Sequence, residues 1–232
     1  MKVLVTRPAE QARALSDALR AEGFEVVEAP LIAVEPLSDE PIDVGGYDYV
    51  IVTSPNGARE LARRATQRPS RVAAIGPGTA EALAGAGLGA DLVARIHTQE
   101  GLVAVFPKPP GRVLFVGAEG ARTHLVDQLD ADFVAAYRTV ELRVDELPAA
   151  DVVMLASSSA ARAYARAGGR GPAVSIGPQT TAAARAAGVD VVAEAEGQDV
   201  RGLVDSATAW RASLRSCQTS GCKTTSSAPA TV

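Results

Sequence analysis

Two short segments combine glycine, proline and threonine at the start of a helical pattern, which is an arrangement suited to binding an anion. Residues 76–79 (GPGT) and 177–180 (GPQT) each follow an apolar run and precede an alanine-rich run that ends at a glycine. The first N–H groups of a helix have no partner within the helix, so a proline costs nothing there and the free groups attract negative charge. We therefore expect anion-binding roles for Gly76, Thr79, Gly177 and Thr180. Both threonines are equally consistent with helix capping.

Serines occupy two further predicted turns between a strand and a helix, and the same argument applies to them. Ser54 precedes Pro55 in the first half of the chain, and residues 157–159 are all serine in the second half. We expect Ser54, Ser157 and Ser159 to bind anionic groups through these helix starts. Ser158 stands where the first turn has a proline, so the two turns are not expected to agree in every detail.

Two arginines, Arg7 and Arg122, follow the first predicted strand of each half. A guanidinium group matches a carboxylate, so both are candidates for substrate binding, and the alternative is that each is an ordinary surface residue. His97 and His124 lie beside no serine or cysteine motif and at no metal-ligand spacing, so we expect surface residues and no metal site. The glycine-proline loops lack the Lys-Ser/Thr pair of a phosphate-binding P-loop.

Short β-like runs alternate with helical runs, and this order occurs twice along the chain. The first half has predicted strands at 3–5, 24–34, 47–52, 72–75 and 90–94, and an acidic linker at 37–46. The second half repeats the order from residue 112 to about residue 210, with its acidic linker at 145–148. This alternation predicts an α/β fold with two similar, flavodoxin-like domains, each a parallel sheet with helices on both faces.

The composition narrows the possible partners. The chain has 232 residues, of which 47% are hydrophobic, and its net charge is −4. That charge argues against nucleic acid as a partner, and no apolar run is long enough for a membrane span. The sequence begins directly with a predicted strand, and Cys217 and Cys222 both lie in a polar tail, so we expect a cytoplasmic protein.

Five segments together resemble the uroporphyrinogen-III synthase family over roughly residues 1–206. They are VLVTRP at 3–8, TSPN at 53–56, IGPGTA at 75–80, AYRT at 136–139 and SIGPQT at 175–180. The resemblance implies one domain formed by residues 1–36 and 139–210 and a second formed by 37–138, joined by two β-type connections near 32–36 and 137–143. Residues 211–232 are expected to be a disordered tail. The sequence alone equally allows two sequential domains.

The resemblance also implies a reaction without a cofactor, carried out by a monomer. The substrate would be hydroxymethylbilane, a linear tetrapyrrole with eight carboxylates. The enzyme, a carbon–oxygen lyase, would remove water and close the ring with inversion of the last pyrrole, through a spiro intermediate, to give uroporphyrinogen III. The helix starts of the two domains would face each other across a cleft and hold this flexible anion in one conformation.

Tyr137 matches the tyrosine that is thought to help the hydroxyl group leave in this family, so the resemblance makes it the catalytic candidate. The alternative is a half-buried linker tyrosine with its ring in the core and its hydroxyl in water. A second function also stays open. A non-catalytic two-domain cytoplasmic binding or sensor protein for an anionic ligand would use the same helix starts and do no chemistry.

Overall fold

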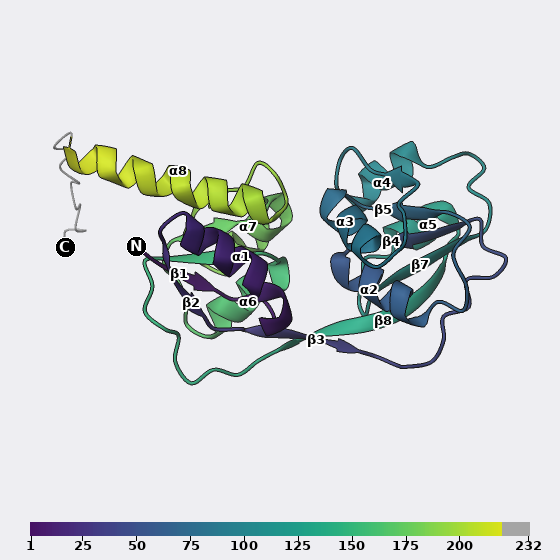
Figure 1. Ribbon diagram of the computed structural model, residues 1–232, viewed down its shortest axis with the longest axis horizontal. Helices are drawn as coiled ribbons and strands as arrows, with labels where there is room; N and C mark the ends of the chain where they lie inside the picture. The colour runs from purple at the N-terminus through teal and green to yellow at the C-terminus, as the bar shows by residue number, and fades with distance from the viewer. Residues whose placement is uncertain (220–232) are drawn as a thin grey trace, which may run out of the picture. The chain divides into compact units, whose positions relative to one another are not determined.

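The computed structural model describes residues 1–219, which form two compact units of strands and helices (Figure 1). The first unit combines residues 1–31 with the chain from residue 143 onward, and the second consists of residues 32–142. The chain therefore leaves the first unit after one βαβ segment and returns to it later. These boundaries differ by a few residues from the predicted ones, because strands β3 (Ile32–Pro36) and β8 (Asp132–Glu141) pair with each other and both belong to the second unit.

The first unit has a sheet of five parallel strands in the order β11-β10-β9-β1-β2. One face of this sheet packs against helices α1 and α8, which Figure 1 shows side by side. The side chains on that face include Val3, Val5 and Met154. Leu4 and Leu155 point to the opposite face, where α6 and α7 pack. The elements are β1 (Lys2–Val5), α1 (Ala9–Ala21), β2 (Glu25–Glu28), β9 (Val152–Leu155), α6 (Ser158–Arg166), β10 (Ala173–Ser175), α7 (Pro178–Ala186), β11 (Val191–Glu194) and α8 (Val200–Thr219).

The second unit has a six-stranded sheet in the order β3-β8-β7-β4-β5-β6, parallel except for β3. In strand β4 (Tyr49–Val52), the side chains of Val50 and Val52 pack toward α2 and α3. Those of Tyr49 and Ile51 pack toward α4 and α5 on the other face. The remaining elements are α2 (Pro55–Arg64), β5 (Val72–Ala74), α3 (Pro77–Gly85), β6 (Leu92–Val93), α4 (Gln99–Val105), β7 (Val113–Ala118) and α5 (His124–Leu129). Both faces are covered, as the alternating sequence pattern predicted.

Both sheets are doubly wound, and β2-β1-β9-β10-β11 in the first unit corresponds in space to β8-β7-β4-β5-β6 in the second, although the strands follow one another in a different order along the chain. Folds of this type bind ligands outside the carboxyl ends of the strands, where the strand order reverses. That point lies beside β1 and β9 in the first unit and beside β7 and β4 in the second. In the first unit, Arg7 and Ser157 follow the strands at this point. In the second unit, Ser54 follows β4 at the corresponding point.

Helix α8 continues to Thr219, so the predicted disordered tail was wrong for residues 211–219. The Arg211 guanidinium lies 3.9 Å from the centre of the Phe24 ring, and Ala212, Leu214 and Arg215 are strong helix formers. The prediction for residues 220–232, including Cys222, lies outside the described residues. No helix within residues 1–219 combines the length and the apolar character needed to cross a membrane.

Candidate functional site

The hydroxyl oxygens of Ser54 and Tyr137 lie 2.7 Å apart in the second unit. Ser54 follows β4 and is the N-cap of α2, where its Oγ accepts a hydrogen bond from the N–H of Gly57 at 3.0 Å. Helix α2 packs against β4, β7 and β8, and Tyr137 comes from β8. Two of the predicted site residues therefore meet at the point where the strand order of this sheet reverses.

A β-bulge at Ala136 gives Tyr137 its direction. Gly117 pairs with Ala135 and Ala118 pairs with Tyr137, so Ala136 is an extra residue in β8. Without this extra residue, Tyr137 would lie on the same face as Ala135, because side chains alternate along a strand. The bulge instead places Ala136 and Tyr137 together in the core beneath α2.

Tyr137 is largely buried, with 6% of its surface exposed. Burial raises the pKa of its phenol, and the hydrogen bond with Ser54 opposes this only in part. The side chain therefore stays protonated at neutral pH and keeps a proton that it can donate. The ring packs in the core, as the alternative interpretation of this residue expected, but the hydroxyl is bonded to Ser54.

The two glycine-proline segments form equivalent helix starts. Gly76 is the N-cap of α3 and Gly177 is the N-cap of α7, and in both helices a proline follows at the first position. Thr79 and Thr180 occupy the third position of their helices, and each is only 4% exposed. No hydrogen bond joins either threonine hydroxyl to another residue in the described part of the chain, so neither acts as a cap.

Side chains from a later loop lie against both glycines, which the sequence alone did not reveal. A Cβ atom added to Gly76 would lie 3.0 Å from Cγ of His97, and one added to Gly177 would lie 3.0 Å from Cγ of Gln198. The sequence indicated an ordinary surface residue at His97, and its contact with Gly76 was not predicted. His97 lies beside the start of α3 and is half-buried.

A second repeated pattern explains why these side chains occupy equivalent places. Thr98 and Asp199 each accept a hydrogen bond from the N–H of a glycine three residues later, Gly101 or Gly202. A buried leucine follows each glycine. His97 and Gln198 directly precede the two caps, so the pattern [TD]-x-x-G-L was the signal that would have located them.

Ser157 caps α6 as Ser54 caps α2. Its Oγ accepts the N–H of Ala160 at 3.1 Å, and its backbone angles (φ −165°, ψ 157°) match those of Ser54 (φ −160°, ψ 157°). Ser158, which replaces the proline, therefore leaves the cap unchanged. Its hydroxyl donates to the carbonyl of Gln179 at 3.1 Å, while Ser159 accepts from Arg162 at 3.4 Å.

The two candidate arginines have different surroundings. Arg7 follows β1 at the edge where Ser157 also lies. Arg122 forms a two-pronged ion pair with Glu100, with distances of 2.6 and 3.2 Å. This ion pair lowers the pKa of Glu100 from 4.5 to about 2, together with a backbone hydrogen bond at Glu100. Arg122 would have to leave Glu100 in order to bind a carboxylate.

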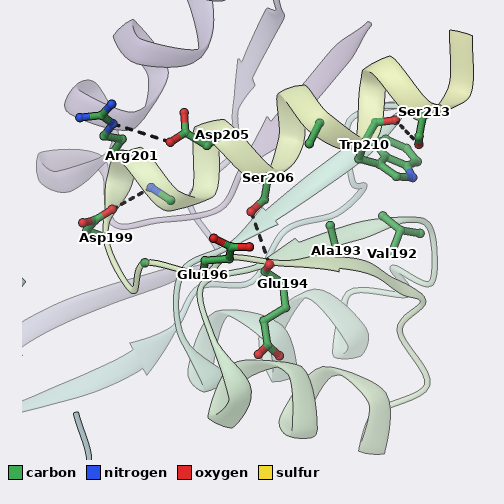
Figure 2. A pocket seen from close by; sticks show the side chains of 13 residues that line it. Val192, Ala193, Glu194, Glu196, Asp199, Arg201, Asp205, Ser206, Trp210 and Ser213 are labelled. Atoms are coloured by element: carbon green, nitrogen blue, oxygen red, sulfur yellow. Dashed lines mark hydrogen bonds and ion pairs between the residues drawn. The ribbon is translucent and has the colours of Figure 1, made fainter. Parts of the chain in front are cut away.

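A groove of about 680 Å³ in the first unit lies between β11 and α8, and none of the predicted site residues lines it (Figure 2). Its charged side chains are Glu194, Glu196, Asp199, Asp205 and Arg201. This excess of carboxylates makes the groove unsuitable for a polyanion. Within residues 1–219, no group of three or more His, Cys, Asp or Glu side chains is placed to hold a metal ion.

Comparisons with known proteins identify relatives of this chain. The family model described as "Uroporphyrinogen-III synthase HemD" matches residues 13–205. A relative from Methanocaldococcus jannaschii is 28% identical over 151 residues, covering 61% of this chain and 63% of its own. The uroporphyrinogen-III synthase of Synechococcus elongatus is 32% identical over 145 residues, covering 56% of this chain and 55% of its own. The chain thus spans less than two thirds of the length of these relatives.

The crystal structure of a mutant uroporphyrinogen III synthase from Thermus thermophilus superposes with a TM-score of 0.61 at 18% identity, covering 93% of this chain and 99% of its own. At that identity the likeness shows the fold. Because the family model matches most of the chain, the sequence identifies the family independently. The chain belongs to the uroporphyrinogen-III synthase family.

Proposed function

We propose that the protein converts hydroxymethylbilane into uroporphyrinogen III, with loss of water and inversion of the last pyrrole ring. The observation that carries this proposal is the contact between Ser54 and Tyr137 at the start of α2. It combines a protonated phenol, held in one direction by a bulge, with a helix start that favours negative charge. A hydroxyl group leaving the substrate needs a donor of this kind.

The proposed proton path uses the geometry of the Ser54 hydroxyl. Its oxygen already accepts the Gly57 N–H, so its own proton is available to the oxygen of Tyr137. The O–H of Tyr137 is then free to donate to the hydroxymethyl oxygen as the C–O bond breaks and water forms. The phenol regains its proton from the pyrrole carbon that loses one when the ring closes, so the step needs no cofactor.

Control of the substrate conformation is the larger part of the proposed task. The pyrrole nitrogen stabilises the cation that is left when the hydroxyl departs, so unassisted closure is easy but gives the uninverted isomer. We propose that the carboxylates bind at backbone N–H groups of the helix starts and at nearby side chains. The proposed binding residues are Gly76, Thr79, Gly177, Thr180, Ser54, Ser157, Ser159, Arg7 and Arg122. The predicted cleft that would gather them stays a prediction.

We further propose that the enzyme acts as a monomer in the cytoplasm. A monomer is consistent with a site that draws its groups from one chain, and sedimentation at working concentration tests it. Measurement of activity in fractionated cells tests the location.

The central experiment adds the protein to freshly prepared hydroxymethylbilane, oxidises the products and separates the porphyrin isomers. The proposal expects the inverted isomer to dominate and to increase with enzyme concentration. If only the uninverted isomer forms while the protein binds the substrate, the protein is a binding or sensor protein and the enzymatic proposal fails.

A further inference from the structure

Arg64, at the end of α2, is an arginine buried inside the second unit, with 8% of its surface exposed. Its Nε donates to the carbonyl of Glu40 at 2.7 Å, and its Nη1 lies 3.5 Å from the carbonyl of Ala136. The carboxylate of Glu60, itself only 9% exposed, lies 3.9 Å away. The guanidinium therefore binds mainly backbone carbonyls of other segments.

One of those carbonyls belongs to the bulged residue that turns Tyr137 toward Ser54. The carbonyl of Ala136 also accepts the N–H of Leu37 at 3.1 Å, where the chain leaves β3. Arg64 thus connects α2, the segment after β3 and the bulge in β8. Residues 37–46, which the sequence indicated to be a linker, are held against α2 at this point, because Ile42 N–H also donates to the carbonyl of Arg64 at 2.8 Å.

Stability alone does not explain a buried charge at this position. Removing a guanidinium from water is costly, and an apolar side chain of similar size often stabilises a core equally well. A guanidinium is planar and has several N–H donors in fixed directions. It can therefore fix the positions of the backbone carbonyls that it binds, which an apolar side chain cannot do. Here one of those carbonyls belongs to the bulged residue Ala136, and the bulge defines the direction of Tyr137.

We propose that Arg64 is a positioning residue for Tyr137, which holds the bulge at Ala136 and thereby keeps the phenol against Ser54. The inference rests on the proposed function in one respect, since its kinetic consequence requires Tyr137 to take part in the reaction. Its structural consequence is independent of any activity. The two consequences are tested separately.

The structural test uses the full-length protein with ¹³C-labelled tyrosine rings. The chain has four tyrosines, and the Tyr137 signal is assigned by its loss in Tyr137→Phe. Arg64→Met is expected to shift or broaden the Tyr137 signal. The matched control is Arg63→Met, because Arg63 is the exposed neighbour whose ion pairs are with Asp39 and Glu60, whereas Arg64 bonds the carbonyl of Ala136 in β8. An unchanged Tyr137 signal in folded Arg64→Met overturns the proposal.

The kinetic test is a double-mutant cycle between Arg64 and Tyr137. Arg64→Met is expected to lower kcat about tenfold with KM nearly unchanged, but to lower it less than twofold in a Tyr137→Phe background. Arg63→Met is expected to leave kcat within a factor of about two. If Arg64→Met does not fold, Arg64→Lys replaces it, because lysine keeps the charge near Glu60 but cannot reproduce the fork. An intermediate loss of kcat is expected for that variant.

The outcomes separate the two claims. If Tyr137→Phe keeps full activity, the catalytic role of Tyr137 fails and the kinetic part of this inference fails with it, while the labelled-ring test still decides whether Arg64 positions the side chain. If Tyr137→Phe loses activity but Arg64 substitutions lower kcat equally in both backgrounds, the catalytic proposal stands and the positioning role is wrong.

Discussion

Tyr137 and Ser54 are separated by 83 residues in sequence, yet their hydroxyl oxygens lie 2.7 Å apart. The contact depends on three features of the second unit: the cap that fixes Ser54, the bulge that turns Tyr137, and the packing of α2 against β8. Each feature is common in proteins. Their combination holds a buried phenol beside a helix start, and we base the first prediction on it.

Ser54→Ala is expected to lower kcat about tenfold, because the Tyr137 O–H loses the partner that directs it. The change should also cost about 1 kcal/mol of stability through loss of the α2 cap. Ser54→Thr keeps a hydroxyl for both the cap and Tyr137, so it should preserve most of the stability and most of kcat. Tyr137→Phe is expected to lower kcat about a hundredfold, and adding Ser54→Ala to it should have little further effect on kcat. Steady-state kinetics with isomer analysis measures these changes, and a full additional loss in the double variant would contradict the proton path.

The buried threonines at the helix starts of α3 and α7 should affect binding without affecting stability. Thr79→Val and Thr180→Val keep the shape of the side chain and remove a hydroxyl that has no partner within the described part of the chain. We expect each change to raise KM by about tenfold or more, the effect of one hydrogen bond to a charged group, with kcat and melting temperature nearly unchanged.

Thr181→Val is the control for these two variants. Thr181 follows Thr180 directly, but its hydroxyl is bonded to Ser175 at 2.5 Å and to the carboxylate of Glu194. Loss of this hydroxyl should lower the free energy of unfolding by about 1 to 3 kcal/mol and leave KM unchanged. If Thr180→Val lowers the melting temperature and leaves KM unchanged, Thr180 has a structural role and does not bind substrate.

The repeated elements of the fold were predictable because they follow local rules. Apolar strands such as Val50–Val52 are buried on both faces, and a proline after a glycine or serine marks a helix start. The end of α8 was not predicted, since the polar composition after Trp210 concealed the packing of Arg211 on Phe24.

The side-chain contacts of the site depend on one extra residue in a strand, which no periodicity in the sequence reveals. The segment AYRT at 136–139 carries no signal that distinguishes a regular strand from one bulged at Ala136. The direction of Tyr137 and its contact with Ser54 therefore emerge only from the paired sheet. His97 was missed for a related reason, because its neighbour Gly76 comes from another loop.

Gly101 and Gly202 should be intolerant of any side chain. A Cβ atom at Gly101 would lie 2.1 Å from the carbonyl oxygen of Ile96, and one at Gly202 would lie 2.0 Å from that of Gly197. Alanine at either position must displace the loop that precedes the helix, at an expected cost of about 3 kcal/mol. Gly85→Ala in α3 is the control, since nothing lies within 4 Å of its added Cβ, and it should stabilise by about 0.5 kcal/mol. Urea unfolding measures the stability of all three alanine variants. A loss below about 1 kcal/mol at both Gly101 and Gly202 would contradict the close contacts described for these two glycines.

The ion pair between Glu100 and Arg122 should make stability depend on pH in acid. The pKa of Glu100 is lowered from 4.5 to about 2, first by the hydrogen bond from Arg122 and then by a backbone N–H. The unfolded chain therefore binds more protons between these values, so this contribution is complete above about pH 4.5 and is lost as pH falls toward 2. Glu100→Gln should lower the urea midpoint at pH 6, and its difference from the unmodified protein should shrink as the pH is lowered.

The same substitution tests whether Arg122 binds substrate. Glu100→Gln releases the guanidinium from its carboxylate partner, so a binding role for Arg122 predicts a lower KM in this variant despite its lower stability. Arg122→Gln should then raise KM, and the double variant should resemble Arg122→Gln alone. If both single variants change stability equally and neither changes KM, Arg122 serves only to join the start of α4 to the loop before α5.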